Sequence, residues 1–263
     1  MQREETSARG GAMDVARQVV VIVALGATIF VNTLANMLPI GGRTTGEVSG
    51  AFPTLFTPAG YAFSIWGLIY LALIVYAVAQ ALPSRRANPD HRAVGWLFVG
   101  TCALNIGWLF AWHNLLIPLS LLLMLGLLIL LILIYVRLDI GRRAVPRFDF
   151  FTLQLPFSLY LGWITVATVA NVSIALQGAG WGRWGLPETV WAVIVIAVAL
   201  VIGMTAVFRR RDAVFSLVLA WAFAAIAVGQ SEYPVVVGTA IAASVLQVAG
   251  AVYALAAGRG SGT

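Results

Sequence analysis

Apolar runs of roughly 20 residues recur along almost the whole chain, and each is long enough to cross a hydrocarbon core of about 30 Å. The runs are continuous, whereas a membrane β-barrel would show short segments of alternating hydrophobicity. Of the 263 residues, 61% are hydrophobic and 10% are charged, which no ordinary soluble domain matches. We therefore predict an all-α polytopic membrane helix bundle. Its eight transmembrane helices are expected near residues 17–38, 58–82, 93–113, 115–136, 150–176, 188–208, 212–229 and 234–257.

The charges support this count of eight. All sixteen basic residues are arginines, and the net charge is +6. With eight spans, fourteen arginines fall on the side of the two termini, and only Arg43 and Arg183 fall on the other side. Basic loops stay in the cytoplasm, so this asymmetry predicts that both termini are cytoplasmic. This topology explains the many arginines, so no nucleic-acid partner is needed to account for them. The chain also has no nucleic-acid-binding motif.

The N-terminal segment and the cysteine content further restrict which class of membrane protein this chain can belong to. The first apolar run is longer than a signal-peptide core and lacks a clear cleavage site, so we interpret it as an uncleaved first span. The single cysteine, Cys102, excludes an intrachain disulfide and a multi-cysteine metal site. We expect an integral multi-pass protein of a prokaryotic cell (inner) membrane, with the lipid bilayer as its first partner.

The segment from Pro53 to Tyr70 is the most aromatic entry into the membrane. Thr57 and Pro58 resemble a helix start, because threonine caps free N–H groups and proline at the first position leaves none unpaired. The connection from Pro39 to Thr57 before it holds four glycines. That connection is either a mobile lid or a plain connector, and the sequence favours neither.

Polar and aromatic residues recur at helical spacing on four predicted spans. Asparagines on three of these spans and Trp108 fall in the half of the bundle away from the arginine-rich side, and Trp66 and Trp163 lie nearer mid-depth. An unpaired amide in lipid is costly, so the asparagines are expected to face protein or a cavity. They could serve interhelical hydrogen bonding alone, or they could orient a ligand in a mostly apolar pocket. The candidate binding residues are Asn32, Asn36, Phe56, Tyr61, Phe63, Trp66, Asn105, Trp108, Trp163 and Asn171.

Several kinds of chemistry lack the residues they need. No Asp, Glu, Lys or Arg lies in the middle of a predicted span, which disfavours a transporter driven by a membrane carboxylate. The sequence has no nucleotide-binding, metal or nucleophile motif, so a binding protein is favoured over an enzyme and no metal site is predicted. His113 could ligate a haem iron, but beside Asn114 it is more typical of a polar turn residue.

The first five spans resemble the TspO/MBR family, the tryptophan-rich sensory proteins related to the mitochondrial translocator protein. Around the second span, the resemblance is carried by Phe56, Pro58, Tyr61, Phe63, Trp66 and Tyr70. Ala59 replaces the second proline of the family pattern, and the interval from Phe63 to Trp66 is one residue shorter. On the third and fifth spans, Asn105 with Trp108 and Trp163 with Asn171 fit the family's motifs.

The resemblance implies a five-helix membrane domain over residues 1–180, with three additional helices over 181–263. It implies a pocket between the first, second, third and fifth spans for a planar hydrophobic ligand, such as a porphyrin or haem, with no cofactor required. A homodimer is also implied. The expected function is a membrane binder or sensor of tetrapyrroles. A transporter or exporter of tetrapyrroles or lipids and a light-dependent porphyrin-degrading activity are the alternatives.

Overall fold

The computed structural model describes residues 2–37, 40–52 and 54–259, and every regular element in these ranges is helical. Seven helical stretches are long and apolar enough to cross a membrane. They correspond to predicted spans within a few residues. Their bounds are Gly11–Met37, Gly60–Ala81, Pro89–His113, Ile117–Arg137, Arg147–Gly178, Glu188–Arg210 and Pro234–Ala257. Leu38, Pro39 and Pro53, at the ends of the predicted first span, loop and aromatic segment, lie outside the described residues.

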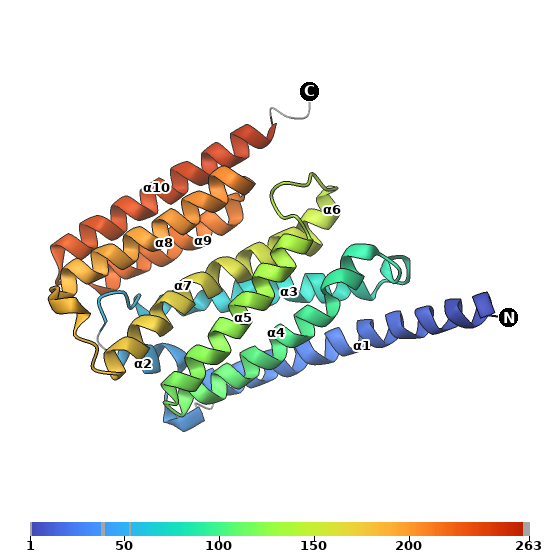
Figure 1. Cartoon of the computed structure of the whole chain (residues 1–263), viewed down its shortest axis with the longest axis horizontal. Coiled ribbons are helices and arrows are strands. Elements are labelled where there is room, and N and C mark those ends of the chain that lie inside the picture. Colours follow the sequence, from blue (N-terminus) through green and yellow to red (C-terminus); the bar gives the residue numbers. More distant parts are fainter. Residues whose placement is uncertain (1, 38–39, 53, 260–263) are drawn as a thin grey trace.

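These stretches belong to named helices that Figure 1 displays in chain order. The helix α1 (Gln2–Met37) is followed by the short α2 (Thr45–Gly50) and by α3 (Ile65–Ala81), which continues the 3-10 turn η2 (Gly60–Ser64). The remaining elements are α4 (Pro89–His113), α5 (Ile117–Arg137), α6 (Arg147–Asp149), α7 (Leu155–Gly178), α8 (Glu188–Arg210), α9 (Ala213–Gly229) and α10 (Pro234–Arg259).

Helix α9 is the segment predicted as the seventh of eight spans. It has 17 residues, so it is about 25 Å long and lies at the lower limit for crossing a bilayer. It packs along α10 and α8, and it also contacts α7. Asp212 caps its N-terminus by accepting a hydrogen bond from the Phe215 amide at 3.0 Å. Seven of the eight predicted spans are therefore long enough to cross the membrane. The remaining one, α9, is a shorter apolar helix packed among them.

Helix α3 begins later than the sequence predicts. Thr57 and Pro58 precede the first helical turn, which starts at Gly60, and the Thr57 hydroxyl pairs with Thr54 Oγ1 at 2.8 Å instead of capping. The amide of Ala59 donates to the carbonyl of Ala225 on α9 at 2.9 Å. A distant helix thus satisfies a donor at this helix start, which local sequence could not indicate.

A π-helical turn, Phe150–Gln154, precedes α7 and has a local cause. Pro156 has no N–H, so the carbonyl of Thr152 cannot receive the usual hydrogen bond from four residues onward. The wider turn keeps α6, the π-helical turn and α7 continuous as one membrane-length stretch.

The arginine-rich turns gather at one end of the bundle, as the charge pattern predicts. In Figure 1 the N-terminus, the α3–α4 connection, the α6 region and the α8–α9 turn all lie toward the same end. Ion pairs link these segments: Arg85 with Asp149 at 2.7 Å, Arg143 with Asp90 at 2.6 Å, and Arg92 with Asp14. The side chains of Arg3, Arg9 and Arg259 lie outside the described residues.

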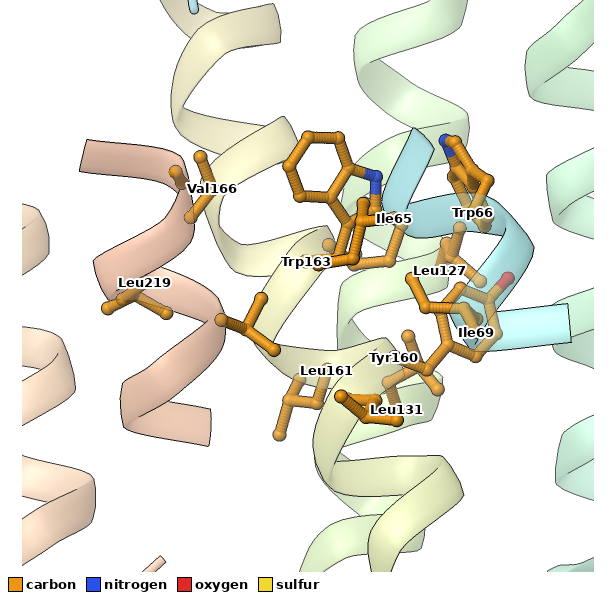
Figure 2. Packing of buried hydrophobic residues seen from close by; sticks show 14 of the residues in the cluster. Ile65, Trp66, Ile69, Leu127, Leu131, Tyr160, Leu161, Trp163, Val166 and Leu219 are labelled. Carbon is orange, nitrogen blue, oxygen red and sulfur yellow. The ribbon is translucent and has the colours of Figure 1, made fainter. Parts of the chain in front are cut away.

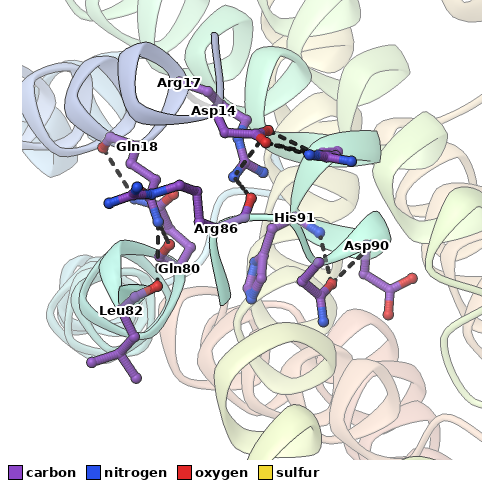
Figure 3. Close-up of polar contacts among 10 residues, drawn as sticks. Asp14, Arg17, Gln18, Gln80, Leu82, Arg86, Asp90 and His91 are labelled. Carbon is purple, nitrogen blue, oxygen red and sulfur yellow. Dashed lines mark hydrogen bonds and ion pairs between the residues drawn. The ribbon is translucent and has the colours of Figure 1, made fainter. Parts of the chain in front are cut away.

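A buried polar group joins α1 to α3 and α4 at this end (Figure 3). The side-chain amide of Gln18 donates to the backbone carbonyl of Gln80 at 2.6 Å, and the side-chain amide of Gln80 donates to the backbone carbonyl of Gln18 at 3.1 Å. Arg17 is 2% exposed and donates to the Arg86 carbonyl at 2.8 Å. These bonds fix the first helix, which has a largely exposed outer face, against the bundle.

Candidate functional site

A small cavity lies among tryptophans at the end of the bundle opposite the arginine-rich turns. Its volume is about 30 Å³, and residues of α2, the segment before η2, η2, α3, α4 and α7 line it. Five of the ten predicted binding residues are among them. The lining consists of Ser49, Pro58, Phe63, Trp66, Trp108, Trp112, Trp163, Val166, Ala167, Ala170 and Asn171.

The aromatic walls of the cavity come from three long helices. Figure 2 shows Trp163 of α7 beside Trp66 and Ile65 of α3. Phe63 meets Trp163 edge to face, with the ring centroids 5.8 Å apart. On α4, Trp108 stacks on Trp112 at 5.4 Å with an interplanar angle of 21°. Flat ring faces and ring edges therefore surround one small space, which is the arrangement that suits a planar apolar ligand.

Asn171 is the polar anchor of this wall. It is 1% exposed, and its Oδ1 accepts from Trp108 Nε1 at 3.3 Å. Its Nδ2 donates to Ser120 Oγ on α5 at 3.1 Å. The amide therefore holds α4, α5 and α7 together and fixes the plane of the Trp108 indole.

Trp163 differs from Trp108 in having no partner for its indole nitrogen. It is 2% exposed and lines the cavity, yet its Nε1–H makes no hydrogen bond within the described part of the chain. A buried donor left unpaired costs about 1–3 kcal/mol. This N–H is a buried group of the tryptophan-lined site that a ligand or a water molecule could satisfy.

Helix α2 covers the cavity and is built as a stable short element. Thr44 caps it by accepting from the Glu47 amide at 3.3 Å, and the Glu47 carboxylate accepts from the Thr44 amide at 2.7 Å. These hydrogen bonds hold the pKa of Glu47 below its usual value. The predicted loop therefore contains an ordered helix, which a flexible glycine-rich connector would not.

Helix α2 is attached to α4 by two side chains near the cavity. Trp112 Nε1 donates to the carbonyl of Thr45 at 3.2 Å, and His113 Nε2 lies 3.4 Å from Thr45 Oγ1. The other ring nitrogen of His113 lies 2.8 Å from the Leu109 carbonyl. Both nitrogens of His113 thus have protein partners, so its side chain here serves the attachment of α2.

Helix α9 holds the segment before η2, which together with α2 forms the cover of the cavity. Gln230 Nε2, just after α9, donates to the Thr57 carbonyl at 2.8 Å, and Trp221 Nε1 donates to the Ala62 carbonyl at 3.2 Å. Together with the bond from Ala59 to Ala225, these contacts pin the stretch that contains Pro58. Helix α9, one of the last three helices, therefore takes part in holding the segment that lines the cavity.

Five of the predicted binding residues lie away from the cavity. Asn105 donates to Tyr160 Oη at 3.1 Å, while Asn36 is exposed and turns back onto Asn32, donating to its carbonyl at 2.8 Å. Tyr61 meets Trp221 edge to face at 5.3 Å. Among the described residues, none from α1 lines the cavity.

Phe56 belongs to a separate small hollow near the outer ends of α7 and α8. It is 2% exposed, and it shares a space of about 30 Å³ with residues that include Trp181 and Trp191. The ring contact between Trp181 and Trp191, at 4.7 Å, closes that end of the hollow. Phe56 thus anchors the segment before η2 against the α7–α8 connection.

The cavity also includes residues that sequence reasoning did not select. Trp112 stands four residues after Trp108 and so shares its helix face, but its place near the end of the span is also typical of a membrane-interface tryptophan. Ser49 and Pro58 come from the covering segment, and their inward placement depends on the contacts with α4 and α9. Helical periodicity could have indicated Trp112, whereas no local pattern marks Ser49.

Comparison with known proteins identifies a family for the chain. No curated protein and no solved structure matches the chain. A family model described as TSPO-like protein matches residues 18–253, which extend from the first turns of the α1 span through most of α10. The match includes the aromatic segment, the covering helix and the last three helices. This integral, multi-pass membrane protein belongs to the TSPO-like protein family.

Proposed function

We propose that the protein binds a planar hydrophobic small molecule, a tetrapyrrole such as protoporphyrin or haem, between α3, α4 and α7 beneath α2. The observation that carries the proposal is the unpaired Nε1–H of Trp163 in a cavity walled by aromatic rings. A tetrapyrrole offers a flat apolar face to those rings and carboxylate oxygens that accept hydrogen bonds. Membership of the TSPO-like family supports a role in membrane ligand binding or sensing.

The size of the cavity requires that binding opens it. A volume of about 30 Å³ has room for one or two water molecules, whereas ligand pockets usually measure about 300–1,000 Å³. Ser49 of α2 and Pro58 form part of the lining that does not belong to the long helices. We therefore propose that α2 and the stretch before η2 move outward as the ligand enters, while the tryptophans of α3, α4 and α7 supply the fixed walls.

Fluorescence titration of the purified protein with protoporphyrin tests the proposal. Bound protoporphyrin is expected to quench tryptophan emission with saturation. The double variant Trp66→Phe/Trp163→Phe is expected to weaken binding about tenfold or more, because both indole rings are reduced to smaller phenyl rings and the unpaired donor of Trp163 is lost. Trp96→Phe is the matched control, since Trp96 is 52% exposed on α4 away from the cavity. An unchanged affinity in the double variant would exclude this site.

Flux and light experiments separate this function from the two alternatives raised by the sequence. Binding without movement of protoporphyrin across proteoliposomes is the result expected of a binder or sensor. Loss of the porphyrin spectrum only in light, abolished in the tryptophan variants, would instead identify a degrading activity.

A homodimer stays a prediction, and comparing titrations at several protein concentrations addresses it.

A further inference from the structure

A lipid-facing groove lies between α5 and α8, with α7 as its floor. Its volume is about 490 Å³, and it shares no residue with the tryptophan-lined cavity. Along most of its length the lining is apolar, and several of its side chains are exposed on the surface of the bundle, including Ile132 at 43% and Ile202 at 39%. The lining comprises Leu128, Ile132, Tyr135, Val136, Arg142, Leu161, Thr165, Ile202, Thr205, Ala206, Arg209, Arg210 and Phe215.

Three arginines line the same groove and make one end of it basic. Arg142 comes from the turn after α5, and Arg209 and Arg210 form the last turn of α8. Arg142 Nε donates to the Arg209 carbonyl at 3.1 Å, which holds the two segments together. Arg210 lies over the ring of Tyr135 at 5.0 Å and pairs with Asp139 at 3.4 Å.

The remaining guanidinium groups have unused donors. Within the part of the chain that the structure describes, the Arg209 guanidinium makes no hydrogen bond or ion pair, and Arg142 uses only its Nε. Both side chains belong to exposed residues. Two unbalanced positive charges with free, fork-shaped donor groups therefore stand where the apolar groove meets the membrane surface.

The nearby carboxylates do not neutralise these two arginines. Asp139 is the partner of Arg210. Asp212 is 5% exposed, and its Oδ2 accepts from Tyr135 Oη at 2.8 Å and from Ser158 Oγ at 2.6 Å. These neutral donors orient Asp212 and leave its charge in place, but three arginines against the two carboxylates still leave the basic end of the groove with a net positive charge.

We propose that this groove binds an anionic glycerophospholipid. Its acyl chain would lie along the apolar wall formed by α5, α7 and α8, and its phosphate would sit between Arg142 and Arg209. Arginine pairs with phosphate through two parallel hydrogen bonds, and basic sites between helices at the membrane surface suit anionic head groups. A second copy of the chain related by a two-fold axis would instead bring arginines against arginines, which is unfavourable.

Native mass spectrometry of the full-length protein with added dioleoyl phosphatidylglycerol or dioleoyl phosphatidylcholine tests this site. The unmodified protein is expected to retain phosphatidylglycerol about tenfold or more in preference to phosphatidylcholine, because phosphatidylglycerol carries a net negative charge, whereas the choline ammonium of phosphatidylcholine offsets its phosphate and is repelled by the arginines. The double variant Arg142→Gln/Arg209→Gln is expected to lose that preference. The matched control Arg137→Gln/Arg147→Gln removes the same charge at the same end and is expected to keep it, since neither residue lines the groove.

Ile202→Trp tests the apolar half by filling the groove while leaving all arginines in place. It is expected to reduce retention of phosphatidylglycerol about as strongly as the arginine variant does. Arg209→Gln alone provides a milder change, because this side chain has no protein partner among the described residues and its loss should leave the melting temperature unchanged.

Three results would overturn the proposal. The first is equal retention of the two lipids by the unmodified protein. The second is an equal loss of preference in the two double variants, which would mean general attraction to the basic surface. The third is full retention by Ile202→Trp together with loss in Arg209→Gln, which would mean that phosphate binds without the acyl chain.

Discussion

Gly229, the last residue of α9, lies against the backbone that leads into α3. A Cβ atom at this position would stand 2.7 Å from the Ala59 amide nitrogen and 3.1 Å from both the Pro58 carbonyl carbon and the Thr57 oxygen. These are backbone atoms, so they cannot rotate aside as a flexible side chain could. The change Gly229→Ala should therefore push α9 away from the stretch that holds Pro58 at the cavity.

The expected cost follows from the contacts that separation would break. The bonds from Ala59 to the Ala225 carbonyl at 2.9 Å and from Gln230 to the Thr57 carbonyl at 2.8 Å would both lengthen. Hydrogen bonds within membrane proteins contribute about 0.6–2 kcal/mol each, and overpacking costs about 1–3 kcal/mol. We expect Gly229→Ala to lower the free energy of unfolding by about 1–3 kcal/mol, after a partial offset from the better helix propensity of alanine.

Reversible unfolding of the purified protein measures this change, and Gly238→Ala on α10 is the control. A Cβ at Gly238 would meet no atom within 4 Å, so the control should be neutral or slightly stabilising. Because Pro58 lines the cavity, Gly229→Ala should also alter protoporphyrin affinity while Gly238→Ala leaves it unchanged. Equal stability of the two variants would refute the idea that α9 supports the entrance to α3.

Three further changes probe the cover and the last three helices. Trp112→Phe removes the bond to Thr45, so stopped-flow quenching should show protoporphyrin entering faster, about tenfold for a loss of roughly 1.4 kcal/mol. Gly203→Ala would place a Cβ in steric conflict with Gln247 Nε2, so it should cost about 1–3 kcal/mol in unfolding experiments, and that cost should shrink in a Gln247→Ala background. The lowered pKa of Glu47 stabilises α2 at neutral pH, and this contribution is lost as the pH falls below 4.5 through the folded-state pKa. Entry should therefore quicken at low pH in the unmodified protein but less so in Glu47→Gln.

The helices and one wall of the candidate site were predictable because their signals are local. A run of apolar residues fixes a membrane helix by its length, and arginines between the runs fix which ends lie together. Helical periodicity likewise put Trp108 on one face of α4, and in the structure it meets Asn171 of α7. Such inferences need only the spacing within one helix.

The cover of the cavity and the partners of several polar groups could not be predicted in this way. Tyr61 packs on Trp221, a residue that follows 160 positions later, because α9 happens to lie against η2. Asn36 satisfies its amide within its own helix, and spacing alone does not distinguish that from a bond across helices. The start of α3 moved beyond Pro58 because the Ala225 carbonyl accepts the Ala59 amide.

A structure of the protein in complex with protoporphyrin tests the central claim most directly. The account predicts a macrocycle between α3, α4 and α7, with its faces against Trp66, Trp108 and Trp163 and with α2 displaced from the position it has without ligand. A macrocycle bound elsewhere on the bundle, such as in a separate apolar groove that Leu68 of α3, Leu159 of α7 and Trp221 of α9 line, with the tryptophan-lined cavity still closed, would contradict it.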